Sequence, residues 1–496
     1  VCAGGCMIYG FSPVGALGLL VRVEVDIRRG LPGTDVVGLP SSEVREARDR
    51  VRVAIRNSGY EYPTDRILIN LSPADVPKVG SGFDLPIALA ILQRSGQVKL
   101  PDRLLATGEL SVRGEIVPVR GTLSAVLSAD DHEVGAVVLG ERALRHMSSH
   151  ISRTPAIHYA SSLRALRSHG LRCAPPRIDD TIASRDSLSL DDIIGQPALK
   201  WSATVAAAGF HNLLLMGPPG SGKTMAARRL STLLPDLSRL AGREVARIYS
   251  MRGLEGSLRR NRPPVRMPHH SASVEGMLGG GKGNLPGEVS LAHNGIMILD
   301  EATEFRPRVL QALREPVERR LVSISRAGRS EEFPARFQLL LTSNLCPCGK
   351  LGQPDARCMC SMQEIERYWR RLGAALLDRV DIRVRTYYQD TPASTPSHEE
   401  LSRRVQRAIH RQEHRAVDSP WVRNGLIPPE AVSRLLPLTD ALERVLRRRM
   451  QQLGLSERAA ASVRAVARTL ADLADRDDVT ARDILEASAL RSPGPV

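Results

Sequence analysis

A glycine-rich stretch after an apolar run constrains the fold of this chain more than any other feature of its sequence. The stretch reads Gly217-Pro218-Pro219-Gly220-Ser221-Gly222-Lys223-Thr224. A predicted buried strand at 211–216, with apolar residues at 213–216, leads into it, and residues 224–234 follow with a helical pattern. Such a loop binds anions, because glycines let backbone N–H groups turn inward at a helix N-terminus. The sequence therefore predicts an α/β fold that binds a nucleotide through its phosphates.

A second predicted strand brings two carboxylates to the same site. Residues 295–299 are apolar and are followed directly by Asp300 and Glu301. In a phosphate-loop ATPase, Lys223 would reach the β- and γ-phosphates of ATP and Thr224 would ligate Mg²⁺. Asp300 would hold the Mg²⁺ shell, and Glu301 would polarise the attacking water. The alternative is a strand that ends in a solvated acidic turn, and the phosphate loop upstream favours the catalytic interpretation.

Asn344 follows a third predicted strand, residues 337–341. An amide at this point can contact the γ-phosphate or the attacking water, which is the position called sensor 1 in AAA+ ATPases. The alternative is an asparagine in an ordinary turn, where this residue is common. We favour the contact with the nucleotide.

Two arginines are candidates for stabilising charge on the transferred phosphoryl group. A guanidinium supplied by a neighbouring subunit accelerates phosphoryl transfer by about 10³–10⁵, and Arg379 is the candidate for this role. From spacing alone, an ion pair of Arg379 with Asp378 or Asp381 is an equal alternative. Arg458 begins a predicted C-terminal helix and is a candidate for contacting phosphate within its own subunit. Sequence alone does not separate it from later arginines of that helix.

The chain divides into segments of different periodicity. Residues 1–172 alternate strand-like stretches with amphipathic helical ones, such as the helix expected over 41–57. Residues 173–190 read as a linker containing proline and aspartate. Residues 191–390 alternate short apolar strands with helices, which predicts a parallel α/β sheet. Residues 391–496 carry apolar stripes at helical spacing. The expected helices there are 401–416, 439–453, 456–473 and 480–490.

Charge indicates a polyanionic partner. The formal net charge is +15 at pH 7, and aromatic residues make up only 3% of the chain, so base stacking is not the expected mode of binding. The alternative is a proteome with an arginine-rich bias. No apolar run approaches the ~20 residues that span a bilayer, and the first residues lack the pattern of a signal peptide. We therefore expect a cytoplasmic protein with no membrane association.

Several further segments carry a resemblance to a known family. They are Pro268-His269-His270-Ser271-Ala272-Ser273, Gly279-Gly280-Gly281, Pro286-Gly287-Glu288-Val289-Ser290-Leu291-Ala292-His293-Asn294-Gly295, and the residues at 344–348 and 376–382. They resemble the competence-protein ComM/YifB family of Mg-chelatase-like AAA+ proteins, and the match covers almost the whole chain.

The resemblance implies a Lon-protease-like α+β domain over 1–172, an AAA+ core of the helix-2-insert clade over 191–390, and a helical lid over 391–496. It implies a homo-oligomeric ring, with a hexamer expected, that hydrolyses ATP with Mg²⁺ at its subunit interfaces. It also implies a DNA motor of helicase or branch-migration type, which acts on single-stranded or branched DNA and is associated in the family with natural transformation. The resemblance favours Arg379 as the arginine supplied in trans.

The N-terminal segment departs from its protease relatives at the positions that matter for proteolysis. Aligning Pro77-Lys78-Val79-Gly80-Ser81-Gly82-Phe83-Asp84 with the nucleophile segment of Lon places Gly82 at the nucleophilic serine. A later match places Leu123 at the catalytic lysine. A Ser–Lys dyad needs a hydroxyl beside a base, and Ser81 lies one residue away. We therefore do not expect proteolysis.

Two basic loops are candidates for contacting DNA. Residues 321–330 read as two strands around a glycine-containing turn, with Arg326 and Arg329 at its tip. Related motors project such a hairpin into the central pore, where arginines grip phosphates without reading bases. The insert at 279–287 carries Lys282 and is the second candidate. The alternative is a pair of exposed basic loops with no partner.

Four cysteines follow the third predicted strand in a paired spacing. Cys346 and Cys348 form one C-x-C pair, and Cys358 and Cys360 form another. Four thiols in a reducing compartment indicate a structural Zn²⁺ site that clamps a loop. Because C-x-C is tighter than the usual C-x₂-C, free thiols or a redox-sensitive pair remain the alternative.

Two other classes of function share this ATPase core. One is a magnesium-chelatase-type subunit that drives metal insertion into a tetrapyrrole, against which the N-terminal segment and the basic charge both argue. The other is an ATPase that remodels proteins. It would respond to a protein client and ignore DNA, so a DNA mobility shift separates it from a DNA motor.

Overall fold

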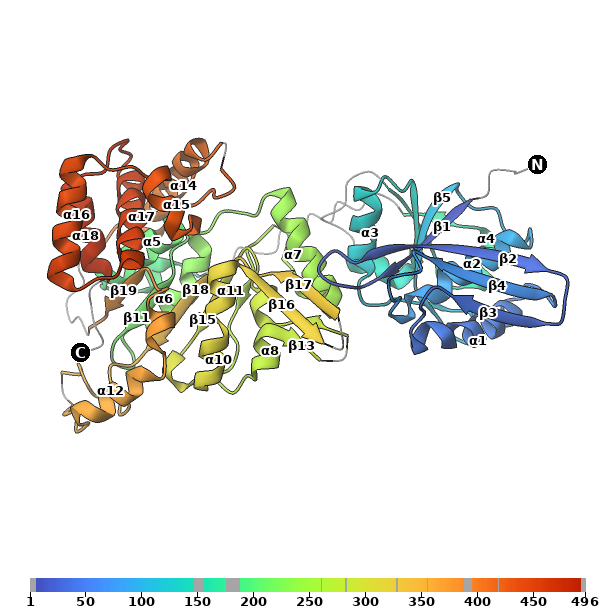
Figure 1. The fold of residues 1–496 in the computed structure, drawn as a ribbon, viewed down its shortest axis with the longest axis horizontal. Coiled ribbons are helices and arrows are strands. Elements are labelled where there is room, and N and C mark those ends of the chain that lie inside the picture. Colours follow the sequence, from blue (N-terminus) through green and yellow to red (C-terminus); the bar gives the residue numbers. More distant parts are fainter. Residues whose placement is uncertain are drawn as a thin grey trace.

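The computed structural model describes residues 6–146, 155–174, 188–259, 261–281, 283–326, 329–354, 356–387, 395–417 and 419–491. Most of the expected linker, at 175–187, lies outside these residues. Figure 1 shows an N-terminal part in blue and cyan, a central part in green and yellow, and a C-terminal set of helices in red.

The N-terminal part is a mixed sheet with helices on both faces. Its strands are β1 (Met7–Ser12), β2 (Leu19–Arg28), β3 (Gly33–Val37), β4 (Arg66–Ser72), β5 (Arg103–Thr107), β8 (Ala136–Gly140), β9 (Ala156–Ala160) and β10 (Arg172–Cys173). In the described part of the chain they form an eight-stranded sheet in the order β10-β9-β8-β5-β1-β2-β4-β3. Its helices are α1 (Ser42–Asn57), α2 (Asp84–Arg94), α3 (Thr122–Asp131) and α4 (Leu163–His169). A two-stranded ribbon, β6 (Glu109–Leu110) and β7 (Ile116–Val117), lies beside them.

Two apolar clusters hold these layers together. Buried residues of α1, α2 and α4 form one cluster with one face of the sheet, and buried residues of α3 form another with Phe11, Leu105 and Val137. Helix α1 begins where the sequence predicts it, because Ser41 Oγ accepts a hydrogen bond from the Val44 N–H at 3.4 Å.

The central part contains the predicted parallel sheet. Its strands are β11 (Leu213–Met216), β12 (Val265–Arg266), β15 (Ile296–Leu299), β18 (Gln338–Ser343) and β19 (Ile382–Arg385), in the order β12-β15-β18-β11-β19. Every adjacent pair is parallel. All residues of β11, β15 and β18 are buried, as expected for strands covered on both faces. Because the three run the same way side by side, the residues at their carboxyl ends meet at one edge.

Helices and two small hairpins surround this sheet. The helices are α5 (Pro197–Gly209), α6 (Lys223–Leu230), α7 (Arg239–Arg252), α8 (Val274–Leu278), α9 (Glu288–Leu291), α10 (Pro307–Ala312), α11 (Arg314–Arg319), α12 (Met362–Arg370) and α13 (Ala374–Leu377). The hairpins are β13 (Gly279–Gly280) with β14 (Leu285–Pro286), and β16 (Leu321–Arg326) with β17 (Arg329–Pro334). The antiparallel pairing of β16 and β17 confirms the strands expected around residues 321–330.

The C-terminal part is helical, as the apolar stripes predict. Its helices are α14 (His398–Arg415), α15 (Pro429–Leu435), α16 (Asp440–Leu453), α17 (Glu457–Leu473) and α18 (Ala481–Arg491). Ser397, Thr439 and Ser456 cap α14, α16 and α17 by accepting hydrogen bonds from backbone N–H groups of the first turn. Buried residues of α14, α16, α17 and α18 share one apolar cluster with α5 and the central sheet.

Helix α7 joins the N-terminal part to the central part (Figure 1). Arg243 forms ion pairs with Asp130 and Asp131 on α3, and Arg247 pairs with Asp131. The guanidinium of Arg247 also donates to Ser128 Oγ at 2.9 Å. Both arginines are at least nine-tenths buried, so this contact is a packed interface.

None of the described helices combines the length and the apolar character needed to cross a membrane.

Candidate functional site

The glycine-rich loop adopts a backbone that only glycine accepts without strain. Strand β11 ends at Met216, and α6 begins at Lys223. Between them, Gly220 and Gly222 have φ angles of 80° and 84°, in the left-handed region. Gly217 is required for another reason, because a Cβ there would lie 2.0 Å from Thr386 Oγ1. The loop thus curls tightly against β19 and turns toward the N-terminus of α6.

Lys223 is held inside this loop. Its Nζ donates to the carbonyl oxygens of Gly217 and Pro218 at 2.8 Å and 2.7 Å, and lies 3.4 Å from Asn344 Oδ1. Burial lowers the pKa of the Lys223 ammonium to about 8, although Asp300 and Glu301 oppose the shift. A bound phosphate group would add negative charge beside the buried ammonium and offset the cost of its burial. The site is therefore suited to an anion.

Oxygen atoms from three elements converge beside the lysine. Thr224 Oγ1 donates to Asp300 Oδ1 at 2.8 Å, and Thr342 Oγ1 donates to the same carboxylate oxygen at 2.6 Å. These atoms come from α6, β15 and β18. A carboxylate and a hydroxyl at this distance are the hard oxygen ligands that Mg²⁺ prefers, so the residues present fit that ion.

Glu301 has an unusual backbone. Its φ angle is 51°, a left-handed value that is uncommon for a residue with a side chain. The Glu301 N–H donates to Thr342 Oγ1 at 3.0 Å, which helps to hold this conformation. Residues kept in strained conformations cluster at functional sites. The turn directs Glu301 to the pocket that Asp300 also lines.

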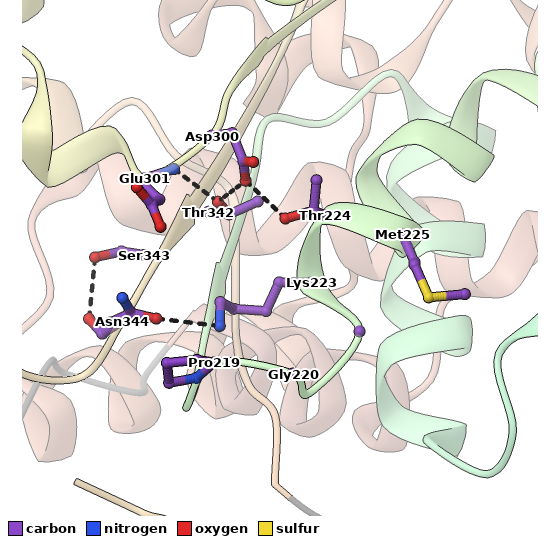
Figure 2. Close-up of a pocket in the computed structure, with 11 residues that line it drawn as sticks. Pro219, Gly220, Lys223, Thr224, Met225, Asp300, Glu301, Thr342, Ser343 and Asn344 are labelled. Atoms are coloured by element: carbon purple, nitrogen blue, oxygen red, sulfur yellow. Dashed lines mark hydrogen bonds between the residues drawn. The ribbon is translucent and has the colours of Figure 1, made fainter. Parts of the chain in front are cut away.

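These residues line one cavity of about 280 Å³ at the carboxyl ends of β11, β15 and β18. Figure 2 shows Asp300 between Thr342 and Thr224, with Lys223 and Asn344 facing each other below them. The lining residues are Pro219, Gly220, Gly222, Lys223, Thr224, Met225, Asp300, Glu301, Thr342, Ser343 and Asn344. The structure thus brings the predicted phosphate-loop, carboxylate and amide residues together.

Sequence reasoning missed two hydroxyls of the site. It gave no role to Thr342, which bonds both Asp300 and the Glu301 N–H. It also missed Thr386, whose Oγ1 lies 2.7 Å from Ser221 Oγ and fixes the phosphate loop against β19. The only signal was a hydroxyl at the end of an apolar strand, and that signal becomes specific only once strand order is known.

Arg379 and Arg458 lie together, away from the residues that line this cavity. Both form ion pairs with Glu318 on α11, and the Arg458 Nη1 to Glu318 Oε1 distance is 2.8 Å. Arg379 also donates from Nη1 to the Ala375 carbonyl at 2.7 Å. Neither arginine is among the described residues that line the nucleotide-sized cavity. Arg379 thus forms an ion pair with Glu318, whereas the alternative drawn from the sequence was an ion pair with Asp378 or Asp381.

The structure gathers the four cysteines that the sequence singles out. Cys346 Sγ lies 3.4 Å from Cys348 Sγ and 3.6 Å from Cys358 Sγ, and the sulfur atoms of all four, Cys360 included, lie within 4.8 Å of one another. A backbone hydrogen bond from Lys350, together with the neighbouring thiols, lowers the pKa of the Cys348 thiol to about 6. This cluster could hold a metal ion.

Comparison with known proteins adds to this geometry. Family models described as "Magnesium chelatase, subunit ChlI", "Subunit ChlI of Mg-chelatase" and "Magnesium chelatase, subunit ChlI C-terminal" match residues 189–393, 23–142 and 395–491. YifB of Escherichia coli, described as uncharacterized, is 38% identical over 95% of this chain and 94% of its own length. Competence protein ComM of Haemophilus influenzae is 36% identical over 98% of this chain and 97% of its own length. The chain belongs to the ComM/YifB family. Membership in this Mg-chelatase-like family indicates an ATPase of the AAA+ type.

A shorter match is to a protease. Lon protease of Chloroflexus aurantiacus is 28% identical over 27% of this chain and 17% of its own length. At the position expected for the nucleophile, Gly82 is buried, and a Cβ there would lie 2.9 Å from Thr107 Oγ1. At the position expected for the base, Leu123 is 1% exposed and packs in an apolar cluster.

The expected DNA contacts are only partly described by the structure. Lys282 and the side chains of Arg326 and Arg329 lie outside the described residues. The backbones of the two arginines face each other where β16 and β17 meet. The two hairpins are adjacent, because Asn284 Nδ2 donates to Glu331 Oε1 at 3.3 Å.

Proposed function

We propose that this family member is an ATP-hydrolysing, ring-forming DNA motor of helicase or branch-migration type. The single observation that carries the proposal is the convergence of Lys223, Thr224, Asp300, Glu301 and Asn344 in one cavity. Such convergence at the carboxyl ends of adjacent parallel strands is what phosphoryl transfer from a nucleotide requires. The proposal places the protein in the cytoplasm, where ATP and DNA are present and thiols stay reduced.

Each pocket residue has a role in the proposed hydrolysis. The phosphate loop and Lys223 bind the β- and γ-phosphates of ATP, and Thr224 and Asp300 would hold Mg²⁺, which supplies charge neutralisation when bound. Glu301 orients and polarises the attacking water, and its strained turn keeps the carboxylate in place. Asn344 contacts the γ-phosphate or that water. Thr342 positions both acidic residues through its hydroxyl.

We propose that the arginines serve a neighbouring subunit. Because Glu318 binds both Arg379 and Arg458, the two guanidinium groups belong to one surface rather than to the pocket of their own chain. The sequence suggests that Arg458 contacts phosphate in cis, whereas its pairing with Arg379 favours action in trans. The site is then complete only in an oligomer, with a hexameric ring as the expected form.

DNA is the proposed substrate of the motor. The net charge of +15 supports a polyanionic partner. Lys282, Arg326 and Arg329, which belong to the sequences of two adjacent hairpins, are the proposed contacts with phosphates. Competence protein ComM is a relative over nearly its full length, which supports a role in natural transformation or recombination. The domain limits of 1–172, 191–390 and 391–496, and the helix-2-insert assignment, remain part of this proposal.

We also propose that the cysteine cluster binds a structural Zn²⁺ ion. Tetrahedral Zn²⁺ with Zn–S bonds of about 2.3 Å places its sulfur ligands about 3.8 Å apart. The observed distances of 3.4 Å, 3.6 Å and 3.7 Å among Cys346, Cys348 and Cys358 are close to that spacing. Four protein ligands leave no open position, so the ion would stabilise the fold and take no part in hydrolysis.

The N-terminal part is proposed to have lost proteolytic activity. Gly82 offers no hydroxyl, and Leu123 places an apolar side chain where a lysine base would be needed. Its packed contact with α7 indicates a structural platform for the motor instead.

Hydrolysis of ATP by the purified full-length chain tests this proposal, with single-stranded DNA, four-way-junction DNA or no DNA added. We expect DNA to raise the rate, and replacement of Arg326 and Arg329 by alanine to weaken DNA binding and flatten its dependence on salt. If none of the DNAs changes the hydrolysis rate of the wild type, the ATPase assignment stands but the DNA-motor proposal is overturned. Stimulation by a protein client or by a tetrapyrrole would then identify the remodelling or chelatase alternative.

A further inference from the structure

The segment that links β18 to α12 crosses over the phosphate loop. It carries the four clustered cysteines, and its described residues form no helix or strand. Two glycines are its contact points. A Cβ on Gly349 would lie 3.1 Å from Pro219 Cγ, and a Cβ on Gly352 would lie 3.8 Å from Pro218 Cδ. The segment therefore rests on both prolines of the phosphate loop.

Both ends of this segment are fixed by hydrogen bonds. At its start, the Leu345 carbonyl accepts a hydrogen bond from Trp369 Nε1–H at 3.2 Å. At its end, Ser361 caps α12 through reciprocal hydrogen bonds with Glu364. In the described residues of the middle, the backbone forms two turn-type hydrogen bonds, from the Gly349 N–H to the Cys346 carbonyl and from the Gln353 N–H to the Lys350 carbonyl, both at 3.1 Å. Ordering this irregular stretch costs conformational entropy that two such bonds recover only in part.

The cysteines occupy both sides of that middle stretch. Cys346 and Cys348 precede Gly349, and Cys358 and Cys360 follow Gly352. An ion bound by all four sulfurs would close the loop that carries both glycines. Cys346 is fully buried at the base of the cluster, so the ion would be tied to the apolar core as well.

We propose that Zn²⁺ at this cluster braces the phosphate loop, so that metal occupancy sets the affinity for nucleotide. The inference rests on the proposed function, which assigns Zn²⁺ to the four cysteines and the nucleotide to the pocket. With the ion bound, Gly349 and Gly352 hold Pro219 and Pro218 in the conformation that presents the loop to phosphates. Without it, nucleotide binding must order the segment as well as the loop, and affinity falls.

Zinc content and nucleotide affinity of the full-length chain test this brace together. Zinc per chain is measured by mass spectrometry, and the dissociation constant is measured with a fluorescent ADP. We expect about one zinc per chain in the wild type. The double variant Cys358→Ser, Cys360→Ser should lose zinc and bind ADP about tenfold more weakly. Cys173→Ser, which changes an exposed cysteine outside the cluster, should leave both values unchanged.

A second pair of variants tests the contact without touching a ligand. Gly349→Ala keeps all four thiols but forces a side chain against Pro219 at a φ of 73°. Gly373→Ala has nearly the same φ, 72°, and nothing within 4 Å of the new Cβ, so it controls for backbone strain. We expect both variants to retain zinc, and only Gly349→Ala to weaken ADP binding.

Three results would overturn the brace, and they are distinguishable. A folded wild type that holds no zinc would remove the ion from the site. Zinc lost to a chelator with the ADP affinity unchanged, or unchanged affinity in Gly349→Ala, would show that the segment does not act on the phosphate loop. A wild type that holds zinc but binds no nucleotide would overturn the proposed function, and the brace with it.

Discussion

Two buried lysines, Lys78 in the N-terminal part and Lys223 in the central part, have similar local chemistry. Lys78 and Lys223 both lie in loops rich in proline and glycine, and each donates from Nζ to carbonyl oxygens of its own loop. Burial lowers the pKa of both ammonium groups. By sequence pattern and by hydrogen bonding, the two residues are close to equivalent.

The two lysines differ in the groups that surround them. Lys223 shares a cavity with Asp300, Glu301 and Asn344, which come from neighbouring strands. The backbone of Lys78 instead bonds to Leu39 and Ser41, which joins its loop to the segment before α1. The comparison shows that a buried lysine in a glycine-rich loop becomes a phosphate ligand only where other strands deliver acidic and amide groups to the same point.

The largest effect is expected from an arginine outside the cavity. Arg379→Ala should lower ATP hydrolysis about 10³-fold or more, because the role proposed for its guanidinium is to stabilise charge on the transferred phosphoryl group of the adjacent subunit. ADP binding should remain close to that of the wild type. Steady-state hydrolysis and fluorescent-ADP titration measure the two effects.

Mixed oligomers sharpen the Arg379 prediction. Combining Arg379→Ala chains with Lys223→Ala chains should restore part of the hydrolysis, since some interfaces then pair an intact pocket with an intact arginine. No recovery at any mixing ratio would show that Arg379 acts within its own chain.

Alanine at each of the two lysines should separate their roles. Lys223→Ala should reduce ATP hydrolysis by about 10²–10³ through loss of an electrostatic contact in the pocket, with little change in thermal stability. Lys78→Ala should keep the hydrolysis rate but lower the free energy of unfolding by about 1–3 kcal/mol, because buried carbonyl groups lose their donor. Equal effects of both variants on hydrolysis would contradict the comparison.

A smaller effect is expected from pH. The pKa of about 8 for Lys223 means that the free site loses its positive charge above pH 8, while bound phosphate favours the protonated form. The dissociation constant for ADP should therefore rise about fivefold from pH 8 to pH 9, which means weaker binding. Lys78→Ala should keep this slope, and Lys223→Ala should lose it.

The same lowered pKa of Lys223 affects folding stability in the opposite direction, because stability rises with pH where ADP affinity falls. Between about pH 8 and the ordinary lysine pKa of about 10.4, the unfolded chain binds more protons than the folded one. The contribution of Lys223 to the free energy of unfolding of the ligand-free protein therefore rises with pH in that window. Chemical denaturation without nucleotide measures it.

Local features were predictable from sequence because local chemistry sets them. Helix α1 lies within the expected 41–57, since Ser41 caps it, and α17 lies within the expected 456–473, since Ser456 caps it. Strands β11 and β15 were recognisable because strands buried on both faces are continuous apolar runs. The phosphate loop was recognisable because its φ angles demand glycine at fixed positions.

The features that escaped prediction depend on contacts between distant segments. Thr342 gains its role only because β18 lies beside β15, which places its hydroxyl next to Asp300. Glu318 joins Arg379 to Arg458, although it precedes Arg458 by 140 residues. The contacts of Gly349 and Gly352 with the phosphate loop depend on the path of a segment without regular structure. No local pattern encodes such relations.

The central claim is that the cavity at the carboxyl ends of β11, β15 and β18 hydrolyses ATP, and Glu301→Gln tests it most directly. The substitution preserves size and hydrogen bonding but removes the carboxylate that activates water. We predict ATP binding equal to that of the wild type and hydrolysis reduced by about 10²–10⁴. Hydrolysis by Glu301→Gln at the wild-type rate would contradict the assignment of this cavity as the catalytic site.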